Sequence, residues 1–253
     1  MEFTDRFYRR DHRQADLVHF QLVVKETDLD IGVRKDRFSP QLVAWVEETI
    51  RTCRTPLEDY LQRDPGFVNA LTPYTVLPNA PLIVKTMVEA GRLAGVGPMA
   101  AVAGAVSEVV GKAIAKRSRD VIVENGGDIF IRTSRIRRIG VFAGESPLSN
   151  RVAIEIRPDE TPLGICTSSG KVGHSLSFGK ADAVVVLSPS VALADAVATA
   201  CGNLVQTTDD LERALKFASE ITGVKGILVI KDDRLAVWGS VKLLPMESSR
   251  GSS

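Results

Sequence analysis

Five short apolar segments follow one another through the middle of the chain, and they constrain its fold more than any other feature. They are 120–124, 128–133, 138–143, 152–156 and 163–167. Short turns or loops join them, whereas parallel strands need crossovers of a dozen or more residues, so an antiparallel sheet is predicted. Further strands are predicted at 17–24, 30–34, 183–187, 226–230 and 234–241.

Amphipathic stretches between these strands predict helices. Ser39-Pro40 is typical of a helix start, with a break expected at Pro56, and Asn79 is expected to cap a helix that ends at Gly95. Other helices are predicted at 98–116, 190–204 and 208–221. The expected fold class is α+β, with helices on one face of a largely antiparallel sheet. We expect a single domain over residues 1–246 and a flexible tail over 247–253, with a subdomain boundary near residues 117–120 as the alternative.

Composition excludes several classes of function. The 253 residues carry a formal net charge of +1, so no global field favours nucleic acid or an anionic membrane as partner. The N-terminus has no apolar signal region, and no apolar run of membrane-spanning length is expected. The three cysteines form no C-x-x-C motif and indicate reduced thiols in a cytosol. We therefore expect a cytoplasmic protein and leave a homo-oligomer open.

Arginines gather locally in two places. One group is Arg6, Arg9, Arg10 and Arg13, and the other is Arg132, Arg135, Arg137 and Arg138. Each group is either a solvated face or a landing site for a phosphate tail.

The helix after Gly97-Pro98 carries a stripe of small residues spaced three and four apart. The stripe consists of Gly97, Ala100, Gly104, Ser107 and Gly111. It lets another backbone or a flat ligand approach closely. The first turn has no acidic residue, so its free N–H groups are suited to a phosphate. Tight helix packing alone is the other interpretation.

The segment Glu124-Asn125-Gly126-Gly127-Asp128 lies between two predicted strands. Asn-Gly is a strong signal for a type I′ hairpin turn. Adjacent glycines also let the backbone press against a ligand, with polar contacts from Asn125 and Asp128.

A third set of polar residues is split in two. Ser168, Ser169 and Gly170 follow a strand and lead to His174, while Asp195 and Thr199 lie four residues apart on a predicted helix. A carboxylate and a hydroxyl on one alanine-rich helix face need partners, and hard oxygens of this kind suit Mg²⁺ together with phosphate oxygens and water. A capping role or a buried hydrogen-bonded pair is the alternative.

Taken in order, these segments resemble the ApbE family, flavin transferases that move FMN from FAD to a protein Thr or Ser. The resemblance covers residues 97–202, through Asn125-Gly126-Gly127-Asp128, Ser168-Ser169-Gly170, His174 and Ala194-Asp195-Ala196-Val197-Ala198-Thr199-Ala200. It implies an α+β fold with a duplicated unit of sheet plus helices.

The resemblance also implies a role for each of these residues. Asp195 and Thr199 would hold Mg²⁺, and His174 would lie near the reacting phosphates as the catalytic residue. The turns at 125–128 and 168–170, together with Gly97, would border FAD or FMN.

The chain departs from the transferases at two motifs. The helix that begins at Gly97 lacks the lysine and aspartate of the transferases, and the loop that follows their histidine is missing after His174. The chain therefore resembles a divergent, cytoplasmic branch of ApbE-like proteins for which no activity is established. Two alternatives to a Mg²⁺-dependent transferase or hydrolase stay open: a role in thiol or sulfur metabolism through Cys166 or Cys201, and a non-catalytic binding or scaffold protein.

Overall fold

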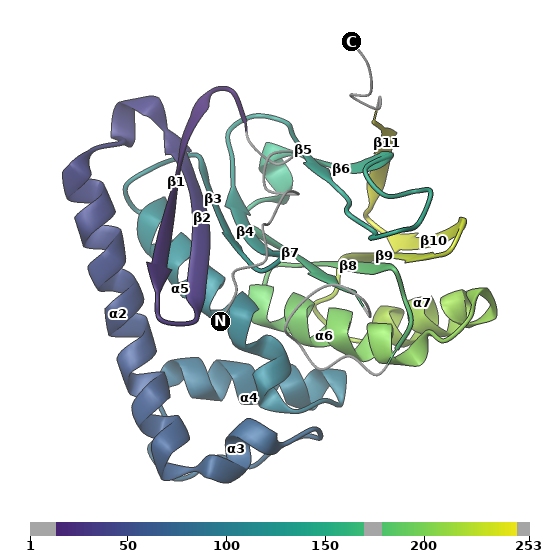
Figure 1. Ribbon diagram of the computed structural model, residues 1–253, viewed down its shortest axis with the longest axis horizontal. Coiled ribbons are helices and arrows are strands. Elements are labelled where there is room, and N and C mark those ends of the chain that lie inside the picture. The colour runs from purple at the N-terminus through teal and green to yellow at the C-terminus, as the bar shows by residue number, and fades with distance from the viewer. Residues whose placement is uncertain (1–13, 170–178, 247–253) are drawn as a thin grey trace.

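An antiparallel sheet of eight strands forms the centre of the computed structural model, which describes residues 14–169 and 179–246 (Figure 1). Its strand order is β1-β2-β3-β4-β7-β8-β9-β10, so the middle of the chain supplies the middle of the sheet. The strands are β1 (Leu17–Val24), β2 (Thr27–Arg34), β3 (Val121–Asn125), β4 (Asp128–Arg132), β7 (Leu163–Ser168), β8 (Ala183–Ser188), β9 (Gly226–Lys231) and β10 (Arg234–Gly239).

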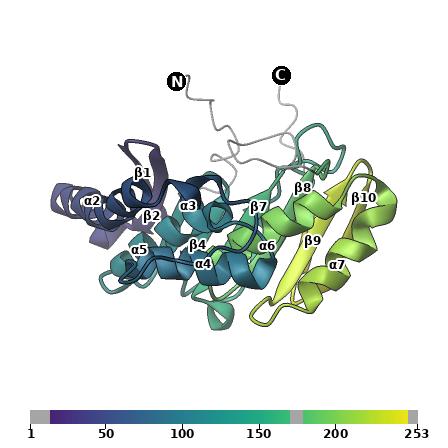
Figure 2. The same ribbon diagram turned by 90° about the horizontal axis from the view of Figure 1, so that it is seen from below.

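Helices cover one face of this sheet (Figure 2), and a small second sheet covers the other. The helices are α2 (Pro40–Arg63), α3 (Pro65–Asn69), α4 (Leu82–Ala94), α5 (Val102–Ala115), α6 (Val191–Leu204) and α7 (Leu211–Ser219). The second sheet has the order β11-β6-β5, from β5 (Arg137–Gly140), β6 (Val152–Ile156) and β11 (Lys242–Pro245). The α+β class and the largely antiparallel sheet are therefore confirmed.

Alternation along the central strands explains the two cores. In β8, Val184 and Val186 point into the core under the helices, while Val185 and Leu187 point into the core under the small sheet. A strand presents successive side chains to opposite faces. Because both faces of the sheet are covered, the central strands are continuous apolar runs in the sequence. The spacing of apolar residues along them therefore did not reveal the second sheet.

Two local expectations were wrong, and one strand was missed. Helix α2 continues through Pro56, because Cys53, Leu57 and Tyr60 stay buried along the same face. Asn79 does not cap α4: its φ is 61°, a left-handed conformation that asparagine tolerates, and the helix begins after Pro81. The edge strand β11 was not expected.

The 18-residue helical segment Pro98–Ala115 is long and apolar enough to cross a membrane by length and composition, contrary to the expectation from sequence. More than half of it is buried in this protein, where its α5 portion packs against β3, β4 and α6. It is therefore a core helix of the fold.

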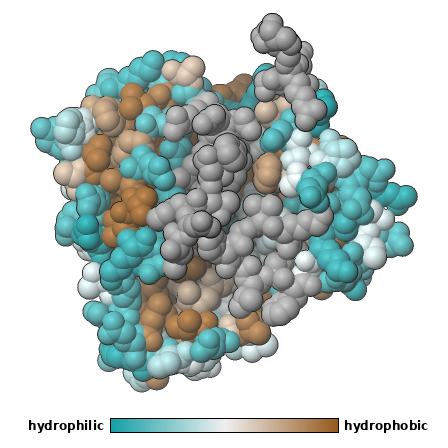
Figure 3. Space-filling view, in the orientation of Figure 1, coloured by the Kyte–Doolittle hydropathy of each residue, from teal (hydrophilic) through white to brown (hydrophobic). Residues whose placement is uncertain are grey.

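Apolar side chains also gather on the surface near α3 and α4 (Figure 3). Leu71 is 57% exposed and Leu82 is 80% exposed, with Val68 and Leu77 in the same stretch of chain. Exposed apolar side chains that gather in one region are typical of a contact region. Whether it serves a homo-oligomer stays a prediction.

Candidate functional site

The turn between β3 and β4 is a two-residue hairpin. Asn125 pairs with Asp128, and the two residues between them, Gly126 and Gly127, have φ values of 67° and 104°. Both glycines are therefore left-handed, as the predicted type I′ turn requires. The Gly127 N–H donates to Glu124 Oε1 at 2.7 Å, and Asn125 Nδ2 donates to the carbonyl of Ala103 at 3.1 Å. The hairpin is thus fixed to the first turn of α5.

Helices α5 and α6 meet closely at Gly104. A Cβ atom added there would lie 2.6 Å from the Val191 carbonyl oxygen and 2.8 Å from Asp195 Cβ. The Gly104 N–H donates to Asp195 Oδ2 at 2.8 Å. The small-residue stripe thus supports close helix packing, the second of its two interpretations, and places the start of α5 against Asp195. Gly97 likewise lies against the backbone of Ala70.

Asp128 and Asp195 form a pair of neighbouring carboxyl groups. Burial, and next the negative charge of Asp195, raise the pKa of Asp128 well above its usual value. Burial raises the pKa of Asp195 to about 7, although N–H groups of Gly104 and Ala103 donate to it. Within the described residues neither carboxyl has an ion-pair partner. Such a pair holds at least one proton at neutral pH and attracts a cation.

Thr199 lies one turn beyond Asp195 on α6 and is only 8% exposed. Its hydroxyl makes no side-chain hydrogen bond to any residue of 14–169 or 179–246. A buried hydroxyl without a partner is costly, so this oxygen is available to a ligand. A buried hydrogen-bonded pair with Asp195, the alternative considered for these residues, is absent from the described structure.

Ser168 ends β7, where it pairs with Val184, and it is partly exposed, as is Ser169. The adjacent pairing of Asp128 with Cys166 puts this strand end beside the carboxyl pair. Gly170 and His174 lie outside the described residues, so their roles remain predictions.

Glu108 is the residue of this region whose role the sequence did not reveal. It lies on α5, is 8% exposed, and its Oε2 accepts from Val191 N at 2.7 Å, Ala192 N at 3.2 Å and Ser190 Oγ at 3.3 Å. The carboxylate therefore satisfies the first N–H groups of α6 from another helix. The available signal was a single acidic residue in a largely apolar helix.

The cysteines do not support the sulfur-handling alternative. Burial raises the pKa of Cys53 to about 11 and that of Cys201 to about 12. Burial, and next the charges of Asp128 and Asp195, raise the pKa of Cys166 well above its usual value. Its Sγ donates to the Val191 carbonyl at 3.4 Å. Protonated, inaccessible thiols are poor nucleophiles.

We therefore expect the three thiols to resist iodoacetamide in the native protein at pH 8 over an hour, and to react within minutes in guanidinium chloride. Mass spectrometry of tryptic peptides measures this residue by residue. Rapid alkylation of Cys166 in the native protein would contradict the buried position of its thiol and restore the sulfur alternative.

Comparisons with known proteins agree with this architecture. A family model described as "AbpE bacteria" matches residues 9–232. A UPF0280 protein of Methanococcus aeolicus is 38% identical over 230 residues, which covers 89% of this chain and 91% of that protein. A UPF0280 protein of Methanosarcina acetivorans is 41% identical over 225 residues, covering 88% of this chain and 86% of that one.

Solved structures show the same fold at low identity. The flavin transferase ApbE from Vibrio cholerae superposes with a TM-score of 0.59 at 17% identity, covering 90% of this chain and 98% of that chain. The ApbE protein of Thermotoga maritima gives a TM-score of 0.54 at 13% identity, covering 88% of this chain and 97% of that chain. Together with the family model and the UPF0280 relatives, this fold identifies the chain as a member of the ApbE-like family, in the branch that contains the UPF0280 proteins.

Proposed function

We propose that this protein binds a flavin nucleotide, FAD or FMN, together with Mg²⁺, and that it transfers the FMN part of FAD to an acceptor hydroxyl. The observation that carries the proposal is the buried pair Asp128 and Asp195, together with the Thr199 hydroxyl, which has no hydrogen-bond partner among residues 14–169 and 179–246. The likeness to a structure named as a flavin transferase supports the choice of ligand.

The oxygen atoms at this site fit a magnesium ion. Asp195 and Thr199 offer a carboxylate and a hydroxyl from adjacent turns of one helix, and the neighbouring carboxyl group of Asp128 adds further oxygen atoms. The described residues contain no cluster of three His, Cys, Asp or Glu side chains suited to a metal. One or two carboxylates suffice for Mg²⁺, because substrate phosphates and water typically complete its coordination.

Bound Mg²⁺ would offset the charge that develops on the pyrophosphate oxygens during transfer. The protein itself supplies the positioning. Gly126 and Gly127 let the hairpin backbone lie close to a flat ligand, and the contact of Asn125 with Ala103 fixes that hairpin. We propose that Ser168 and Ser169 border the nucleotide, that His174 lies near the phosphates, and that AMP leaves as the FMN phosphate bonds to the acceptor oxygen.

Thr199 provides a direct test. Titrating the protein with FAD in a calorimeter should give a binding component that requires Mg²⁺ and disappears in EDTA. Thr199→Val, which keeps the shape but removes the hydroxyl, should weaken that binding by about tenfold, whereas Thr199→Ser should bind as wild type. Equal binding by the Val and wild-type proteins would remove Thr199 from the metal site.

A non-catalytic binding protein is the second candidate, favoured by the absence of the transferase lysine and aspartate after Gly97. The two candidates differ in whether AMP is released from FAD. The protein is incubated with FAD, Mg²⁺ and a Ser- or Thr-containing acceptor peptide, and the released AMP is measured by chromatography. Binding of FAD without any AMP release would favour the second candidate.

A further inference from the structure

A pocket of about 570 Å³ lies at the opposite end of α5 from the candidate site. Six of its lining residues are cations, and none is acidic: Arg34, Arg37, Lys116, Arg117, Arg119 and Arg132, with Ala115 and Ser118 between them. Residues 104 and 115 are separated by roughly 16 Å along the axis of α5, so this basic pocket is a separate site. Its size lies within the range of small-molecule sites.

Three of the arginines are held in place by the fold. The Arg34 guanidinium donates to both carboxylate oxygens of Asp36, at 2.8 and 3.3 Å. Arg117 stacks on the Trp45 ring at 3.8 Å, and Arg132 donates to the Ala115 carbonyl at 2.7 Å. Binding to side chains that are already ordered costs less conformational entropy.

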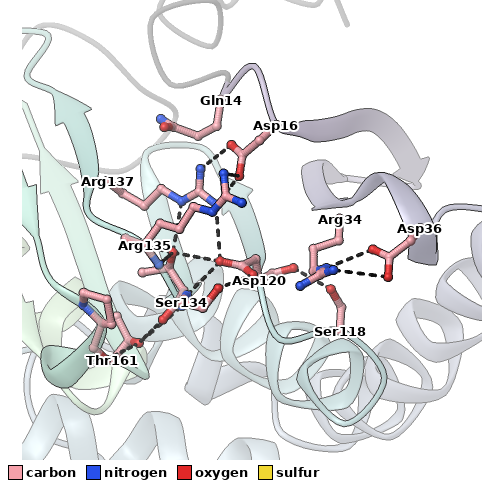
Figure 4. Close-up of polar contacts among 12 residues, drawn as sticks. Gln14, Asp16, Arg34, Asp36, Ser118, Asp120, Ser134, Arg135, Arg137 and Thr161 are labelled. Atoms are coloured by element: carbon pink, nitrogen blue, oxygen red, sulfur yellow. Dashed lines mark hydrogen bonds and ion pairs between the residues drawn. The ribbon is translucent and has the colours of Figure 1, made fainter.

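The wall beside Ser118 is also fixed (Figure 4). The Ser118 hydroxyl donates to the Asp120 carbonyl at 2.6 Å, and the Asp120 carboxylate accepts from the N–H and the hydroxyl of Ser134, each at 2.7 Å. Arg137 pairs with Asp120 at 3.3 Å and with Asp16 at 2.5 Å. Arg135 also pairs with Asp16, at 3.6 Å, so two arginines balance the two carboxylates, and Asp120 does not cancel the charge of the pocket.

The end of α5 alone does not account for so many cations. A helix C-terminus carries roughly half a negative charge, which offsets less than one of the six. Lys116 and Arg119 are exposed and, within residues 14–169 and 179–246, pair with no acidic group. Their uncompensated charge raises the free energy of the unliganded protein and would be relieved by an anion.

We propose that the basic pocket binds a small molecule through a diphosphate or longer phosphate chain. Arginine forks match phosphate oxygens in pairs, and several converging guanidinium groups favour more than one phosphate. The net charge of +1 disfavours nucleic acid as the ligand, and the Trp45 ring is already covered by Arg117 rather than open for base stacking.

The test uses calorimetric titration with inorganic pyrophosphate and with ATP, in EDTA so that no divalent cation supports binding at the carboxyl pair. We expect one site per chain. The charge reversals Lys116→Glu and Arg119→Glu together should weaken binding at least about tenfold, because each replaces a positive charge that attracts the anion with a negative charge that repels it. A matched double reversal at the exposed residues Lys85 and Lys225, each to Glu, should leave the affinity within about twofold.

Tighter binding of ATP would identify a nucleotide, and equal binding would identify the diphosphate group alone; both support the proposal. Absence of heat with both anions overturns it, as does unchanged affinity in the Lys116 and Arg119 variant. Binding of a single-stranded RNA oligonucleotide without binding of either small anion also overturns it. Lys116→Gln, which keeps the local shape, should weaken binding severalfold and provides the answer if the double variant does not fold.

Discussion

Asp195→Asn is expected to stabilise the metal-free protein at pH 8 by about 1–3 kcal/mol while abolishing Mg²⁺-dependent binding of FAD. The substitution keeps an oxygen to accept the Gly104 N–H, but it removes a carboxylate whose ionisation the buried site disfavours. A substitution that stabilises the protein but abolishes ligand binding is typical of a functional site.

The pH dependence follows from the direction of the shift. The pKa of Asp195 is raised to about 7 in the folded protein from 3.8, so the folded state holds more protons than the unfolded state between these values. Stability from this group is therefore present below about pH 4 and is lost as pH rises to about 7. The difference between Asp195→Asn and wild type should be small at pH 4.5 and reach its full size at pH 8.

Urea unfolding in EDTA at the two pH values measures this difference. Asp209→Asn, the same chemical change at an exposed position, serves as the control and should alter stability by less than about 0.5 kcal/mol at both. A pH-independent difference, or destabilisation by Asp195→Asn at pH 8, would show that burial does not oppose the charge of Asp195.

Uptake of Mg²⁺ should displace the proton that the carboxyl pair holds. The affinity for Mg²⁺ in the presence of FAD is therefore expected to fall as pH drops below about 7, and the calorimetric heat should depend on the ionisation enthalpy of the buffer. Asp195→Asn should abolish both effects. Persistence of buffer-dependent heat in that variant would assign the metal to other residues.

The sequence predicted the parts of this structure that depend on neighbours along the chain. The Asn125-Gly126-Gly127-Asp128 hairpin follows from local backbone chemistry, and the helix predicted at 190–204 is α6, which Ser190 caps. Positions decided by distant contacts were missed, because the burial that keeps α2 helical through Pro56 comes from the rest of the fold. The second sheet depends on β11, which pairs with β6 from far along the chain.

The same division applies to the candidate site. The spacing of Asp195 and Thr199 places both on one face of α6, as the sequence indicated. The proximity of Asp128 depends on β4 pairing with β7 and on α6 crossing α5 at Gly104, neither of which a local pattern encodes. The role of Glu108 at the start of α6 was hidden for the same reason.

Glu108→Ala is expected to lower the free energy of unfolding by roughly 3 kcal/mol, a large effect for one side chain. The substitution leaves the N–H groups of Val191 and Ala192 buried without an acceptor and removes negative charge from the positive end of α6. Urea unfolding with a linear extrapolation provides the measurement.

Two matched variants separate the causes. Glu108→Gln keeps an acceptor oxygen and should cost about 1 kcal/mol, whereas Lys112→Ala removes only the exposed partner of Glu108 and should cost less than about 0.5 kcal/mol. If Glu108→Ala cost no more than Lys112→Ala, the carboxylate would contribute no more than a surface ion pair. Because Asp195 lies one turn into the helix that Glu108 caps, we also expect Glu108→Ala to weaken Mg²⁺-dependent FAD binding, and Lys112→Ala to leave it unchanged.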